Sequence, residues 1–95
     1  MQCESLDQVR EGIDQIDAKI VGLIAERGGY VLQAARFKKD RAEVAAPQRV
    51  EQVIAKTMAL ATKLNADPVV VEKVYRAMIS GFIEMELSAH EQRKL

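Results

Sequence analysis

An arginine occupies a position where the sequence pattern predicts an apolar residue. The apolar residues that recur at steps of three and four along the first third of the chain are Leu6, Val9, Ile13, Ile16, Ile20, Leu23, Tyr30, Ala34 and Phe37. This spacing predicts an apolar stripe on a helix, and Arg27 falls in the same series. Burying a guanidinium without an anionic partner is costly, because the group does not lose its charge. Since no Asp or Glu lies in the stripe nearby, the sequence predicts an anionic ligand for Arg27.

Two further cations, Lys38 and Arg10, stand at informative spacings from Arg27. In a continuous helix, Lys38 points within about 20° of Arg27 and lies about 16 Å along the axis, so the two can bracket one small anion. Arg10 lies about 25 Å away and is rotated by about 100°. It cannot share a ligand with Arg27 of its own chain, but a dimer can bring it to the pocket of the partner subunit. Taken alone, Lys38 and Arg10 are equally consistent with a solvated face.

Arg49 and Glu86 are further candidates for the same pocket. Arg49 falls in the first turn of a predicted helix, where it either closes a pocket or is solvated. Glu86 continues a helical stripe of apolar residues, Tyr75, Ile79 and Phe82. Burial of a carboxyl favours its protonated form, which can donate a hydrogen bond. The alternative is a frayed last helical turn that leaves Glu86 in water.

Other common catalytic patterns are missing from the sequence. His90 has no Asp, Ser or Cys at a suggestive spacing, and Ser80-Gly81 lacks the surroundings of a hydrolase nucleophile. We therefore expect His90 to be structural or exposed. There is also no glycine-rich phosphate loop and no zinc-ligand spacing, so the expected site has no cofactor and no metal.

The elements that must position these residues are predicted to be helices. Ser5 and Gln8 form a capping pattern, after which the apolar stripe predicts a helix from Leu6 to about Lys39. Gly28-Gly29 could break this helix in two, but the stripe keeps its phase across the pair, which favours one continuous helix. A loop is expected over Asp40–Ala46.

Two more helices follow, each beginning at a proline. Pro47 suits a first helical position, and the apolar spacing that follows it extends to Leu64. Asn65–Pro68 combines a helix stop, an N-cap and a second first-turn proline, which predicts a third helix from Pro68 to about Glu91.

Length and composition favour one small domain that associates with a second copy. A chain of 95 residues supports a single domain, residues 1–95, and one this short is often stabilised by association. The long first helix exceeds what the other two can cover, so we expect a homodimer; the alternative is a monomer with a broken first helix. Zero net charge, few aromatic residues and no long apolar run argue against nucleic-acid and membrane partners. The single Cys3 and the lack of a signal-peptide pattern favour a cytoplasmic protein.

Several stretches together resemble the all-helical class of chorismate mutases over nearly the whole chain. They are Leu6–Arg10, Ile13–Asp17, Leu23–Arg27, Phe37-Lys38 and Pro47–Val50. The resemblance implies three helices per chain in an intertwined homodimer bundle, with chorismate or isochorismate, both small dianions, as the substrate. It also implies the roles of the site residues: Arg27 and the partner subunit's Arg10 hold the two carboxylates, Lys38 and a protonated Glu86 donate to the ether oxygen, and Arg49 closes the pocket.

Within that family, the chain is especially similar to the isochorismate pyruvate-lyases, which form salicylate. The similar stretches are Tyr30-Val31, Ala34–Lys38 and Ala46–Val50. Typical mutases carry acidic residues in place of Ala46 and Val50, and bacterial members usually carry Gln in place of Glu86. The first expectation is still the rearrangement of chorismate to prephenate, because it is the broader family activity. The alternatives are the lyase reaction and, from another class, a non-catalytic helical dimerisation module.

Overall fold

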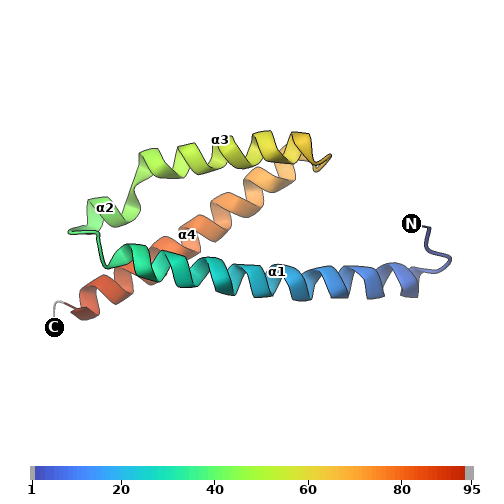
Figure 1. The fold of residues 1–95 in the computed structure, drawn as a ribbon, viewed down its shortest axis with the longest axis horizontal. Coiled ribbons are helices and arrows are strands. Elements are labelled where there is room, and N and C mark those ends of the chain that lie inside the picture. The colour runs from blue at the N-terminus through green and yellow to red at the C-terminus, as the bar shows by residue number, and fades with distance from the viewer. Residues whose placement is uncertain (1, 94–95) are drawn as a thin grey trace. The chain divides into compact units, whose positions relative to one another are not determined.

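The computed structural model describes residues 2–93, which contain helices and turns and no strand. The helices are α1 (Leu6–Ala35), α2 (Arg41–Ala45), α3 (Pro47–Lys63) and α4 (Pro68–Arg93), labelled in Figure 1. The all-α class predicted from the sequence is confirmed for the described residues, with three long helices and one short one. The chain divides into two compact units, Met1–Val31 and Leu32–Leu95.

α1 begins at the capping pattern predicted from the sequence. The backbone N–H of Gln8 donates to Ser5 Oγ at 3.2 Å, and the backbone N–H of Glu4 donates to Gln8 Oε1 at 2.8 Å. The first bond satisfies an N–H group that the first helical turn would otherwise leave unpaired, and the second ties the residue before the cap to that turn. The helix continues through Gly28-Gly29. The alternative of a break at the glycine pair is therefore wrong.

α1 ends at Ala35, before the predicted end near Lys39. The backbone N–H groups of Arg36, Phe37 and Lys38 donate to carbonyls three residues earlier, those of Gln33, Ala34 and Ala35, at 3.0–3.2 Å. Such bonds tighten and end a last helical turn. Phe37 is consequently 82% exposed and is not part of a helical stripe. The predicted alignment of Lys38 with Arg27 on one helix is wrong, because Lys38 lies beyond the helix.

The segment predicted as a loop contains the short helix α2. Asp40 is its N-cap, with an extended backbone (φ −145°, ψ 177°), and its carboxylate accepts a hydrogen bond from the Glu43 N–H at 2.9 Å. The Glu43 carboxylate in turn accepts from the Lys39 N–H. An Asp followed by Glu three residues later is a known helix-start signal, and it is the signal that the loop prediction overlooked.

α3 and α4 begin and end close to the predicted positions. Ala46 adopts a left-handed conformation (φ 38°, ψ 61°) and separates α2 from Pro47, the first residue of α3. At the other end of α3, Asn65 is also left-handed (φ 61°), and the Ala66 N–H donates to the Ala61 carbonyl at 2.8 Å, as in a Schellman ending. Asp67 then caps α4 by accepting from the Val69 N–H at 2.9 Å.

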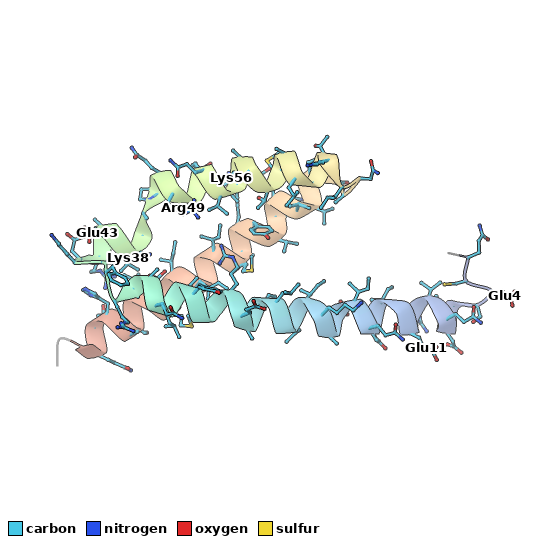
Figure 2. The ribbon with its side chains drawn as sticks, viewed as in Figure 1. Glu4, Glu11, Lys38, Glu43, Arg49 and Lys56 are labelled. Atoms are coloured by element: carbon cyan, nitrogen blue, oxygen red, sulfur yellow. The ribbon has the colours of Figure 1, made fainter. Side chains whose placement is uncertain are left out.

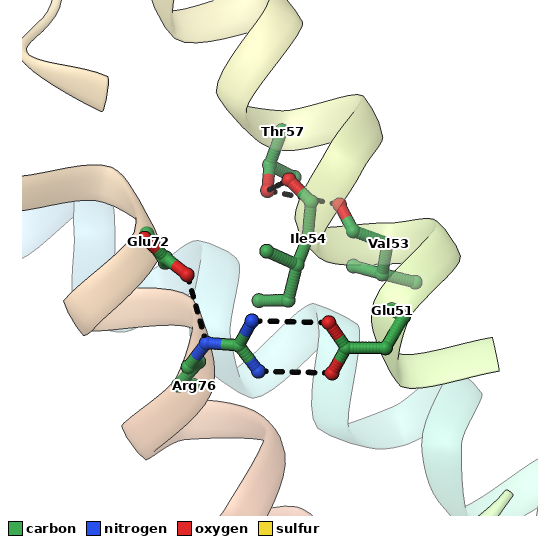
Figure 3. A network of polar contacts seen from close by, with 6 residues as sticks. All are labelled: Glu51, Val53, Ile54, Thr57, Glu72 and Arg76. Carbon is green, nitrogen blue, oxygen red and sulfur yellow. Dashed lines mark hydrogen bonds and ion pairs between the residues drawn. The ribbon is translucent and has the colours of Figure 1, made fainter. Parts of the chain in front are cut away.

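α3 and α4 pack against each other, and α2 also contacts α4. The buried apolar side chains of this unit are Ala35, Val44, Ile54, Ala61 and Ile79. Arg76 of α4 reinforces the packing with a bidentate ion pair to Glu51 of α3, at 3.0 Å for each bond, and with a third bond to Glu72 (Figure 3). The Arg76 hydrogen bond lowers the pKa of Glu51 below its ordinary value of 4.5.

The apolar stripe of α1 is largely exposed. Its exposed members are Leu6, Val9, Ile13, Ile16, Ile20 and Leu23, with exposed fractions from 40% at Val9 to 63% at Leu23. A row of this length on one face of a helix is typical of an interaction surface. None of the helices in residues 2–93 combines the length and the apolar character that a membrane span needs.

Candidate functional site

A cation and a carboxylate from distant parts of the sequence meet within the unit Leu32–Leu95. The Lys38 ammonium donates a hydrogen bond to Glu86 Oε2, with Nζ 2.9 Å from the oxygen. The Glu86 side chain is 4% exposed, whereas that of Lys38 is 26% exposed. The pair is therefore buried on its α4 side and open to solvent on its lysine side. Such a position allows Lys38 to meet a ligand.

Glu86 is buried because of its position on α4. It lies one turn after Phe82 on the stripe that also contains Tyr75 and Ile79, and residues four apart share one face of a helix. The prediction that this carboxyl enters an apolar face is confirmed by its burial. The alternative, in which Glu86 bends into water from a frayed end, is wrong, because α4 continues to Arg93.

Lys38 lies in the connector between α1 and α2, here defined as residues 36–40 (Figure 2). Two other contacts hold this region against the last turns of α4. The Lys39 carbonyl oxygen lies 3.3 Å from His90 Nε2, and Arg41, the first residue of α2, forms an exposed ion pair with Glu91. Three side chains of α4 thus contact the chain at Lys38 and at two residues that follow it, Lys39 and Arg41.

Arg49 lies in the first turn of α3 and is exposed (Figure 2). It lines an open hollow of about 470 Å³ together with Ala46, Pro47, Gln48 and Gln52. The neighbouring Val50 is half-buried and lines a second hollow together with residues of α4, which are Arg76, Ile79, Ser80, Ile83 and Glu84. Positions 46 and 50 are themselves Ala and Val and supply no carboxylate there.

Arg10 and Arg27 belong to the unit Met1–Val31. Both lie on the continuous α1, so the rise per residue places their Cα atoms about 25 Å apart. Arg10 is exposed and Arg27 is half-buried. The two guanidinium groups of one chain are therefore too far apart to grip the same small molecule, as the spacing predicted. Of the five candidate residues, the structure brings Lys38 and Glu86 into contact.

His90 is the residue of this region that the sequence analysis set aside. Its side chain is buried, and it approaches the backbone next to Lys38. A signal was present in the sequence, because His90 stands four residues after Glu86 and so continues the same stripe of α4.

The chemistry available to the pair follows from its donors and acceptors. A lysine ammonium has three N–H donors and no acceptor. Glu86 takes one of these donors, which leaves the others for an oxygen atom of a ligand. An ammonium that is held in place on a buried wall can stabilise negative charge that develops on such an oxygen.

Comparison with known proteins identifies similar sequences. The profile of the family described as "Chorismate mutase type II" matches residues 9–87. The chain is also 32% identical over 92 residues to a Pseudomonas aeruginosa protein named "Isochorismate pyruvate lyase". That alignment covers 97% of this chain and 91% of the Pseudomonas protein. The matched region includes all five candidate residues.

Proposed function

Because this chain belongs to the chorismate mutase type II family and is an enzyme of that kind, we propose that it catalyses a pericyclic reaction of a chorismate-type dianion. The observation that carries the proposal is the contact between Lys38 and the buried Glu86. The helical dimerisation module considered from the sequence is set aside, since both the family and the relative from Pseudomonas are enzymes.

Of the two reactions, we place pyruvate elimination from isochorismate first. The relative of nearly equal length is named for that reaction. Typical mutases, according to the family resemblance, carry acidic residues at the positions of Ala46 and Val50, and this chain carries none at either position. Rearrangement of chorismate to prephenate is the second candidate, because the matching profile is that of the chorismate mutases.

Both reactions break the bond between a ring carbon and the oxygen of an enolpyruvyl ether. In the lyase reaction, a ring hydrogen passes to the methylene carbon of the side chain as that C–O bond breaks, and the products are pyruvate and salicylate. No covalent intermediate with the enzyme is needed. The protein contributes by folding the substrate into the reactive geometry and by stabilising charge on the ether oxygen.

The candidate residues divide these tasks. Lys38 donates to the ether oxygen with an N–H group that Glu86 does not use. Arg27 holds one carboxylate and the partner subunit's Arg10 holds the other. Arg49 closes the pocket at the start of α3. We propose that Glu86 is the ionised partner of the ammonium, to which Lys38 donates at Oε2. This role differs from the one expected from the sequence, in which a protonated Glu86 donates to the ether oxygen.

The proposed active unit is a homodimer in which residues 1–95 of each chain act as one domain. The exposed apolar stripe of α1 supports this proposal, because a second copy of the stripe would cover it. Ile16 lies in the middle of the stripe, so Ile16→Glu should abolish the dimer in sedimentation experiments and abolish activity with it. Gln15→Glu adds the same charge away from the stripe and should leave the dimer intact. A dimeric Ile16→Glu variant would contradict the proposed interface.

The reaction is tested by incubating the purified protein separately with isochorismate and with chorismate and identifying the products. We expect salicylate and pyruvate from isochorismate. Prephenate from chorismate with no salicylate would instead make the chain a mutase, and no product from either substrate would refute both proposals.

The role of Lys38 is tested by Lys38→Ala, which should remove most of the turnover while the protein remains folded. Lys39→Ala is the matched control, since the Lys39 side chain is exposed and the contact of Lys39 with His90 of α4 is made by the backbone carbonyl. If Lys38→Ala changed KM and left kcat unaltered, Lys38 would not stabilise the transition state.

A further inference from the structure

His90 is a buried polar side chain that the proposed reaction does not use. It lies near the end of α4 and is 8% exposed. Its Nε2 atom is 3.3 Å from the carbonyl oxygen of Lys39. Its Nδ1 atom is buried and has no hydrogen-bond partner among the described residues. Because buried polar atoms are nearly always hydrogen-bonded, an imidazole with one paired and one unpaired nitrogen requires an explanation.

The contact with Lys39 determines which nitrogen carries the proton. A backbone carbonyl can only accept, so Nε2 must donate and therefore bears the hydrogen. In the neutral ring, Nδ1 then carries a lone pair. The described residues offer Nδ1 no hydrogen-bond partner, so the hydrogen bond that the ring makes to them is the one from Nε2 to the Lys39 carbonyl.

The residue that His90 contacts is the immediate neighbour of Lys38. Among the described residues, Lys38 is the last residue of the connector whose N–H donates to a backbone carbonyl, and Asp40 is already extended. Glu86 and His90 are one turn apart on α4. Glu86 therefore holds the side chain of Lys38, while His90 holds the backbone at the next residue.

We propose that His90 is a positioning residue, which fixes the connector backbone so that the Lys38 ammonium is held where the substrate ether oxygen binds. The inference rests on the proposed function of Lys38. His90 does not touch the substrate, and its effect on the reaction passes through Lys38. A side chain that only filled space would not need a hydrogen-bond donor at this position, whereas His90 places Nε2 beside the Lys39 carbonyl.

Three substitutions of His90 separate the hydrogen bond from the volume of the ring. A Gln side chain can place its amide nitrogen near the position of Nε2, whereas the Asn amide nitrogen reaches only as far as Nδ1. Leu fills space and cannot donate. We expect His90→Leu and His90→Asn to lower kcat about tenfold, since small displacements of a catalytic group have effects of this size or larger. KM should change by less than about twofold, because the arginines bind the substrate carboxylates equally well in the ground state and in the transition state. His90→Gln should recover most of the lost kcat.

Two controls complete the kinetic experiment. Glu91→Gln breaks the exposed ion pair with Arg41, which also joins α2 to α4, and it should leave kcat unchanged. In a Lys38→Met background, His90→Leu should cause no further loss, because the group that it positions is absent. Equal losses in both backgrounds, or no recovery by Gln, would overturn the positioning role.

A measurement without substrate tests the hydrogen bond itself. The chain contains a single histidine, so the ¹⁵N resonances of the imidazole need no assignment by mutation. We expect Nε2 to carry a proton in both the wild type and Lys38→Met. A ring protonated on Nδ1 alone would overturn the inference. Should the wild type convert neither substrate, the proposed function fails, and the NMR result still decides whether His90 donates to Lys39.

Discussion

Replacing Lys38 by Met is expected to leave the Glu86 carboxylate buried without its cation. At 2.9 Å, two unit charges attract by up to about 6 kcal/mol with an effective dielectric constant of about 20. Breaking a fully buried pair typically costs about 3–5 kcal/mol, mostly because one charge stays buried. Lys38 is 26% exposed, so water screens part of the attraction. We therefore expect Lys38→Met to lower the free energy of unfolding by about 2–3 kcal/mol.

Glu86→Gln should be milder, because an amide keeps an acceptor for Lys38 and carries no charge. We expect a loss of about 1 kcal/mol, typical of a weakened hydrogen bond. The double variant has no buried charge left and should be more stable than Lys38→Met alone. The coupling free energy between the two positions should thus be about 1–2 kcal/mol.

Denaturant unfolding followed by circular dichroism measures these differences. One fixed protomer concentration is used throughout, because the proposed dimer would make the free energy of unfolding depend on concentration. Lys39→Met is the matched control and should change the free energy of unfolding by less than about 0.5 kcal/mol, as for most surface substitutions. If Lys38→Met were as mild as this control, or if the two substitutions at positions 38 and 86 were simply additive, the described ion pair would not hold Lys38 in solution.

Three further predictions follow from individual residues. If Glu86 acts as the anion that holds Lys38, Glu86→Gln should lower kcat at every pH; a wild-type rate that falls with rising pH, and that Glu86→Gln makes flat, would restore the acid role. Ala46→Gly should leave thermal stability unchanged or raised, because left-handed backbone strains Ala, whereas Ala45→Gly within α2 should cost about 1 kcal/mol in denaturant unfolding. Because Arg76 lowers the folded-state pKa of Glu51, the pair stabilises above pH 4.5 and loses its effect as the pH falls through the lowered pKa; Arg76→Met should therefore lower the melting temperature at pH 7 and not at pH 2, and an equal loss at both would show that the ion pair is not the cause.

The parts of the fold that the sequence predicted are those set by local chemistry. Ser5 caps α1, Pro47 begins α3 and Asp67 caps α4, each through bonds to atoms within a few residues. Helical periodicity likewise predicted the burial of Glu86, because a stripe on a helix faces one neighbour along its whole length.

The end of α1 could not be predicted in the same way. Apolar spacing continued to Phe37, yet the helix stops at Ala35 and Phe37 is exposed. The three backbone bonds from Arg36, Phe37 and Lys38 to carbonyls three residues earlier end α1, and the capping pattern of Asp40 and Glu43 then begins α2. A short capped helix of five residues has no apolar period of its own, so periodicity alone does not reveal it.

In the candidate site, too, the features set by local sequence were predicted and those set by distant contacts were not. Lys38 was placed on a helix, where its direction would follow from its spacing to Arg27. It lies instead in a connector, where nothing in the local sequence sets its direction. Its position depends on Glu86, and on His90 holding the carbonyl next to it from 51 residues further along the chain. A catalytic cation on a helix would be positioned by its own backbone, whereas one on a connector requires partners. The two α4 side chains supply that restraint, so changes on one face of α4 should alter turnover even where they never meet the substrate.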